Sequence, residues 1–139
     1  MCFELLVQIA EGAPGRVGAR QLEQLSGLVV TGSRLNKKPA LHLSVSGGCS
    51  CGFLAQGPNR HGSKWILNPE ELPKLEAAIR ALNTQAQKYR LVAHWLGSDV
   101  ERTEQHLTGA ELLKVVENNQ LCDNVVYRTW HDLREERTS

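Results

Sequence analysis

The chain has 139 residues, of which 41% are hydrophobic and 22% are charged, and its formal net charge is +1. This length favours one globular domain with a substantial core. The near-neutral charge argues against a protein that binds nucleic acid or an anionic membrane surface, and no apolar run approaches the length of a membrane span.

The first predicted element is a strand over residues 2–10, which is apolar on both faces and therefore suits the centre of a sheet. Because this stretch contains Glu4 and has no basic segment before it, it does not resemble a secretory signal. We therefore expect a cytoplasmic protein in which the four cysteines are reduced.

The next predicted element is a short helix over residues 19–26, with Leu22 and Leu25 facing inward and Gly27 after its last turn. Residues 28–31 either finish this helix or form a brief extended segment, and we favour the segment. The basic residues of 34–39 are interpreted as a solvated turn.

The clearest hairpin signal lies at Gly47 and Gly48, between two alternating stretches, 41–46 and 49–54. Glycine tolerates the positive φ angles that a two-residue turn requires. With the glycines in the turn, one face of the hairpin is apolar and suits burial against a helix. The other face is polar and carries His42, Cys49, Cys51 and Phe53.

The cysteines of this polar face, Cys49 and Cys51, form a candidate metal or redox site. Their Cα atoms would lie roughly 6.6 Å apart along a strand, near the limit of about 6.8 Å for an unstrained disulfide. Two thiolates on one side, with His42 diagonally across, could instead bind a soft metal such as zinc or copper. The alternative is that they are small packing residues, because a single Cys-x-Cys pair is a weak signal.

A candidate anion site lies in the polar, glycine-rich loop 56–64. Its backbone amides, together with Arg60, His61 and Lys64, could hold an anion. The loop lacks the spacing of a phosphate-binding loop, so the simpler interpretation is an ordinary connection. If residues 65–67 form a further strand, the loop joins two strands of a meander.

A second helix is predicted from Asn68, which can cap it, and Pro73 indicates that the first turn is a separate piece. Its inward face would carry Leu72, Leu75, Ile79, Leu82 and Ala86.

The rest of the chain predicts a strand over 89–96, an acidic turn over 97–104 and a helix over 108–118. The helix opens on a capping box, Thr108 to Glu111, and Asn118 and Asn119 can end it. A last strand over 125–130 follows.

The order of elements predicts an α+β fold, in which helices cover one face of an antiparallel sheet. The first six elements match the split β-α-β-β-α-β (ferredoxin-like) pattern, and the last helix and strand would extend it. We expect one domain over 1–130 and a charged tail over 131–139. Phe53, Trp95 and Trp130 could partly cover the other face of the sheet, or a second subunit could, which makes a homodimer plausible.

The sequence does not identify a function. The first hypothesis is a small, non-enzymatic binding or regulatory domain that acts as a homodimer. The alternative is a thiol or metal-binding protein that uses Cys49 and Cys51, and an enzyme with Cys49 and His42 as nucleophile and base ranks below it. RNA binding on the sheet is not expected, because residues 51–54 lack the basic residue and second aromatic of the corresponding motif.

Overall fold

The computed structural model describes residues 3–35, 37–45, 50–53, 68–95, 103–122 and 125–130. These residues form an α+β fold with three helices and a six-stranded, mostly antiparallel mixed sheet. The strands are β1 (Phe3–Ile9), β2 (Val29–Leu35), β3 (Lys38–Ser44), β4 (Tyr89–Trp95), β5 (Thr103–His106) and β6 (Val125–Arg128). The helices are α1 (Ala19–Ser26), α2 (Leu72–Gln85), α3 (Gly109–Glu117) and a 3₁₀ turn, η1 (Ser50–Phe53).

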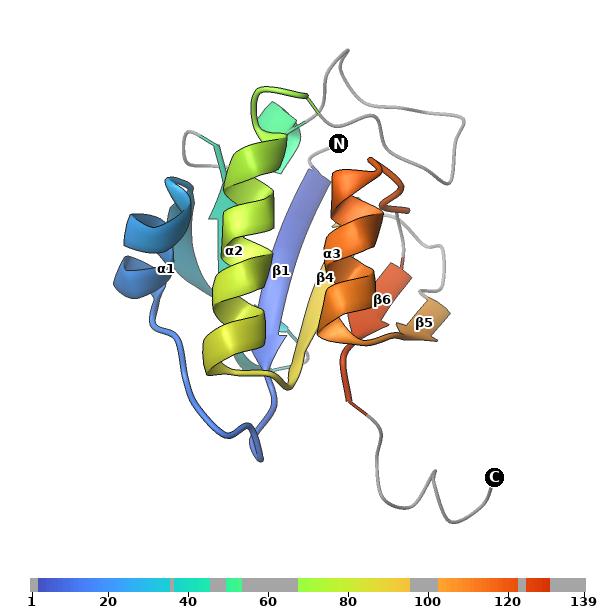
Figure 1. The fold of residues 1–139 in the computed structure, drawn as a ribbon. Helices are drawn as coiled ribbons and strands as arrows, with labels where there is room; N and C mark the ends of the chain where they lie inside the picture. Colours follow the sequence, from blue (N-terminus) through green and yellow to red (C-terminus); the bar gives the residue numbers. More distant parts are fainter. Residues whose placement is uncertain are drawn as a thin grey trace.

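The strands lie side by side in the order β2-β3-β1-β4-β6-β5, and only the β5–β6 pair is parallel. Figure 1 shows α1, α2 and α3 together on one side of this sheet. The predicted α+β class, with the helices on one face of the sheet, is therefore confirmed. Within the described residues, no helix has both the length and the hydropathy needed to cross a bilayer.

The main core lies between the helices and the near face of the sheet. Alternate side chains of β1 and β4 enter it, since successive side chains of a strand point to opposite faces. Leu5, Val7 and Leu91 are fully buried there. Removing each such side chain from water contributes about 1.5–3 kcal/mol to folding.

The bounds predicted for α1 are confirmed, and Gly27 ends it in the left-handed region at φ 80°. Leu22 is fully buried, whereas Leu25 is 49% exposed, so the inward position predicted for Leu25 is wrong. Ser26 is buried in its place, and its hydroxyl donates to the Leu22 carbonyl at 2.6 Å. This bond satisfies the polar group that would otherwise be costly to bury.

The predicted separate piece before α2 is also confirmed. Residues 69–71 form a turn, and the Asn68 side chain accepts from the Glu70 N–H at 3.4 Å. The regular helix begins at Leu72, which places Pro73 in its first turn, where no backbone donor is required. The predicted inward face is confirmed for Leu75, Ile79, Leu82 and Ala86, which are fully buried.

The capping box predicted for α3 is present. The Thr108 hydroxyl accepts from the Glu111 N–H at 3.1 Å, and the Glu111 carboxylate accepts from the Thr108 N–H at 2.9 Å. These bonds hold the pKa of Glu111 below its usual range. The capping bond therefore stabilises the fold above the ordinary carboxyl pKa and is lost as the pH falls through the lowered value.

The hairpin predicted at Gly47 and Gly48 is corrected. Residues 50–53 form η1 and not a strand, and the hairpin of this region is β2–β3, with Lys37 in its turn at φ 67°. Residues 34–35 and 38–39 are consequently the ends of these two strands. Because β3 already pairs with β2 on one side and β1 on the other, it has no free edge for a strand from residues 49–54.

The register predicted for Phe53 is wrong for the same reason. Phe53 is fully buried in the main core beside the helices and does not lie on a polar sheet face with His42. Its carbonyl accepts from the Asn68 N–H at 2.6 Å, which links η1 to the turn before α2.

The structure also contains a strand that the sequence pattern did not predict. Residues 103–106 form β5, parallel to β6, where an acidic turn over 97–104 was expected. All four residues are exposed, so β5 has none of the apolar alternation that identifies a strand in sequence. The predicted strand 65–67 and tail 131–139 lie outside the described residues.

On the far face of the sheet, the described residues form a small apolar cluster. Leu6, Ala40 and Val92 are buried there with Leu35. Leu25, on the opposite layer, is the one large hydrophobic side chain that is exposed in the described part of the chain. The large bare apolar face expected from the sequence is therefore not present among these residues.

Candidate functional site

The sheet has a gap in its hydrogen bonding between β1 and β3, near the C-terminal end of β1. These two strands pair only from Leu5↔Leu43 to Val7↔Leu41, whereas β1 stays paired with β4 as far as Ile9. Continuing the register would place Pro39 opposite Ile9. A proline has no N–H to donate to a ladder, so the pairing ends here and the two strands separate.

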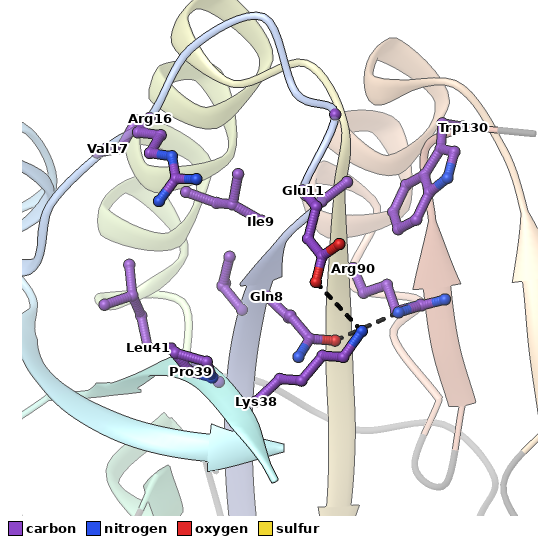
Figure 2. Close-up of a pocket in the computed structure, with 14 residues that line it drawn as sticks. Gln8, Ile9, Glu11, Arg16, Val17, Lys38, Pro39, Leu41, Arg90 and Trp130 are labelled. Carbon is purple, nitrogen blue, oxygen red and sulfur yellow. Dashed lines mark hydrogen bonds and ion pairs between the residues drawn. The ribbon is translucent and has the colours of Figure 1, made fainter. Parts of the chain in front are cut away.

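A cleft of about 710 Å³ lies at this gap and is drawn in Figure 2. Its walls come from the end of β1 and the loop that follows it, from the beginnings of β3 and β4, and from Trp130 after β6. This volume is within the range of small-molecule sites in proteins, which is roughly 300–1,000 Å³.

The two sides of the cleft differ in chemistry. In Figure 2, Ile9, Val17, Pro39 and Leu41 lie on one side and form an apolar wall. The apolar wall has Arg16 beside it. The opposite side carries polar and charged groups, namely Gln8, Glu11, Lys38, Arg90 and the indole of Trp130.

Gln8 organises the polar side. Its amide nitrogen donates to the Leu35 carbonyl at 3.3 Å, which joins β1 to the end of β2 across the gap. Its amide oxygen accepts from Arg90 Nη1 at 3.3 Å, and the Arg90 guanidinium lies 4.9 Å from the centre of the Trp130 ring. Arg90 is thus held by a hydrogen bond and a cation–π contact, each of which restricts where its charge can lie.

Three cationic side chains, Arg16, Lys38 and Arg90, line the cleft against a single carboxylate, Glu11. Lys38 Nζ lies 3.3 Å from Glu11 Oε1, but the two side chains are 63% and 86% exposed, so the ion pair contributes at most about 1 kcal/mol. Arg16 is exposed and makes no ion pair or hydrogen bond within the described residues. The cleft therefore has an excess of positive charge, including one guanidinium without a partner.

The loop that carries Arg16 contacts the rest of the fold at Ala10 and at Gly15. The Ala10 N–H donates to the Lys88 carbonyl at 2.9 Å. Within the loop, the Ala13 N–H donates to the Ala10 carbonyl at 3.1 Å. Gly15 approaches the last turn of α2 so closely that a Cβ there would lie 2.2 Å from the Gln85 carbonyl oxygen. Arg16 follows this contact directly, so the contact positions it.

The predicted metal ligand His42 lies on β3 and is 7% exposed. Its Nε2 atom is 3.4 Å from the hydroxyl oxygen of Ser50 in η1. Cys51 is also in η1, and Cys49 lies outside the described residues, as do Arg60, His61 and Lys64. Within the described residues, no group of three or more His, Cys, Asp or Glu side chains could hold a metal ion.

The buried pair of Ser50 and His42 does not have the arrangement of a nucleophile and its base. Ser50 is fully buried, accepts from the Leu5 N–H at 2.9 Å and donates to the Leu43 carbonyl. Its hydroxyl thus bridges β1 and β3 at the opposite end of their ladder from the cleft. This hydroxyl both accepts and donates a hydrogen bond within the sheet and is closed to solvent, so we assign it a structural role and not a catalytic one.

We expect Ser50→Ala to lower the free energy of unfolding by about 1–2 kcal/mol, because it leaves a buried N–H and a buried carbonyl without a partner. Urea denaturation followed by circular dichroism measures this change. Ser33→Ala, at a half-buried position of the edge strand β2, is the control and should change stability by less than about 0.5 kcal/mol. Equal stability of the two variants would contradict the bridging role of Ser50.

A second charged cluster lies on β5 and β6, at one edge of the sheet. Arg128 Nε lies 2.6 Å from Glu104 Oε1 of β5 in an ion pair, and it donates to His106 Nε2 at 2.9 Å. Arg128 is 6% exposed and lies 5.3 Å from the centre of the Trp130 ring. Because the charged and polar groups of this cluster already bind one another, fewer of them are available to a ligand than in the cleft.

No family model, curated protein or solved structure matches this chain.

The sequence reasoning missed the cationic residues of the cleft. Lys38 was interpreted as part of a solvated turn, and Arg16 and Arg90 were not singled out. One signal was available: Pro39, inside a stretch that pairs on both sides, indicates a place where a sheet ladder is interrupted.

Proposed function

We propose that this protein is a non-enzymatic binding module that takes a small anionic ligand into the cleft between β1 and β3. The observation that carries this proposal is the exposed guanidinium of Arg16, which has no partner among the described residues and faces a cleft with an excess of positive charge. A guanidinium presents a planar set of donors that matches a carboxylate or a phosphate in two parallel hydrogen bonds.

The lining of the cleft favours binding over catalysis. No serine, cysteine or histidine is among its lining residues in the described part of the chain. Glu11 is the one carboxylate, and it is 86% exposed and paired with Lys38. A carboxylate that acts in acid–base catalysis is usually shielded from water inside its cleft, and Glu11 is not shielded in this way.

We expect Arg16→Gln to weaken the binding of acetate and of inorganic phosphate by about tenfold or more, because a hydrogen bond to a charged group contributes about 1.5–3 kcal/mol. The measurement is a titration followed by amide chemical shifts in two-dimensional NMR. In the wild type, the shifts should be concentrated in residues 9–12, 16–17, 38–41 and 90.

The matched control is Arg20→Gln, which removes the same charge from an exposed position of α1 that does not line the cleft. If the control weakens binding as much as Arg16→Gln does, the effect is only that of net charge. Shifts scattered over the surface, or unchanged affinity in Arg16→Gln, would rule out the cleft as the site.

We further propose that β1, α1, β2, β3, α2 and β4 form a split β-α-β (ferredoxin-like) unit. The strand order β2-β3-β1-β4 and the antiparallel pairing of each neighbouring pair support this assignment. The assignment carries no functional argument, because this arrangement occurs in proteins with unrelated functions.

Two hypotheses from the sequence stay predictions. A homodimer agrees with a binding or regulatory role, although the anion proposal requires no residue from a second subunit. A zinc or copper site at Cys49, Cys51 and His42 depends on Cys49, which lies outside the described residues.

A further inference from the structure

We propose that the ligand of the cleft is a small amphipathic carboxylate, that is, an organic acid with a flexible apolar body. The carboxylate would bind Arg16, and the body would lie along the apolar wall of Ile9, Pro39 and Leu41. This inference rests on the proposed anion-binding function and adds the class of anion.

The apolar wall is accessible because the strands separate. Ile9 and Leu41 are half-buried and Pro39 is exposed, at the ends of β1 and β3 that no longer pair with each other. Figure 2 shows these side chains on the same side of the cleft as Arg16 and Val17. A ligand that reaches the Arg16 guanidinium is therefore beside apolar surface, which favours an acid with hydrocarbon attached over a bare inorganic anion.

The charges of the cleft favour a monoanion. Lys38 is paired with Glu11, and Arg90 is engaged by Gln8 and Trp130, so among the described residues that line the cleft Arg16 is the cation left for a ligand. One guanidinium neutralises one carboxylate in two parallel hydrogen bonds. A phosphate dianion would need a second cation, and it would also be repelled by the Glu11 carboxylate.

The aromatic group of the cleft argues against a nucleotide or another stacked aromatic ligand. The Trp130 ring already contacts two guanidiniums, those of Arg90 at 4.9 Å and Arg128 at 5.3 Å. A base would have to displace one of these cation–π contacts in order to stack on the ring. An aliphatic ligand can bind without displacing either of these cation–π contacts.

The test is a chain-length series of acetate, butanoate, hexanoate and octanoate, each below its micelle concentration, titrated into the wild-type protein and followed by amide and methyl chemical shifts. We expect affinity to rise about twofold to threefold for each added methylene, somewhat below the fourfold limit for complete burial. The methyl signals of Ile9 and Leu41 should shift with octanoate and hardly at all with acetate.

Two variants separate this inference from the proposed function. Arg16→Gln should lower the affinity for every acid by the same factor, since it removes the headgroup contact alone. Ile9→Thr keeps the branched shape of the side chain but makes it polar, and it should reduce the gain in affinity for each added methylene.

If acetate and octanoate bind equally and both depend on Arg16, or if phosphate binds more tightly than octanoate, the amphipathic ligand is wrong and anion binding stands. If none of these anions binds in the cleft, the proposed function is wrong and the inference is lost with it. Because the chain-length series uses the wild-type protein, the comparison among the acids does not depend on whether a variant folds.

Discussion

Phe53→Ala should lower the free energy of unfolding by about 3–5 kcal/mol, the range for removing a buried phenylalanine from a well-packed core. Phe53 has no exposed surface and lies in the main core, although it comes from a short 3₁₀ turn that follows β3 and precedes α2 in the chain. Substitution leaves a cavity that the surrounding helices and strands cannot fully close. Urea denaturation monitored by circular dichroism measures the loss.

The matched control for Phe53→Ala is Leu25→Ala, which truncates a large hydrophobic side chain at a position that is 49% exposed. We expect the control to change stability by about 0.5 kcal/mol or less. The comparison decides between η1 and the hairpin predicted from the sequence, in which Phe53 faces outward. A loss of less than about 1 kcal/mol in Phe53→Ala would support the hairpin and contradict the placement of η1.

Gly15→Ala should cost about 2–3 kcal/mol, in the upper part of the usual range for overpacking. The added Cβ would lie 2.2 Å from the Gln85 carbonyl oxygen, and because this is a backbone atom at the end of α2, it cannot move away as a flexible side chain could. The loop must shift instead, and Arg16 shifts with it. We therefore expect weaker acetate binding together with a lower midpoint of thermal unfolding.

Gly12→Ala is the control for Gly15→Ala, since both glycines lie in the same loop and a Cβ at Gly12 meets nothing within 4 Å. It should change stability by about 0.5 kcal/mol or less. Similar unfolding midpoints in the two alanine variants would show that the loop does not make its close approach to α2.

Several elements could be predicted because their signals are local. The ends of α1 and α3 follow from Gly27, Thr108 and Glu111, each of which acts on backbone groups within four residues. The inward face of α2 follows from the helical spacing of Leu75, Ile79 and similar side chains. Such contacts form in the same way wherever the helix is placed, so their sequence pattern is sufficient.

The errors concern contacts between distant residues. The glycine pair at 47–48 is a good turn signal, yet β3 has both of its edges occupied by β1 and β2, and residues 50–53 therefore form a 3₁₀ turn. β5 has no apolar alternation and forms a strand because β6 offers it an edge. Strand pairing depends on which neighbouring strands have a free edge, and a short stretch of sequence does not contain this information.

The sequence alone was sufficient to establish the α+β class, the helix ends and most of the core side chains, because each depends on spacing along the chain. The cleft was decided by tertiary structure. Arg16, Lys38 and Arg90 come from three separate segments, and they meet only because β1 pairs with β4 on one side while Pro39 ends its ladder with β3 on the other. Charged residues on exposed turns carry no periodic signal, so their convergence follows from the folding of the whole sheet.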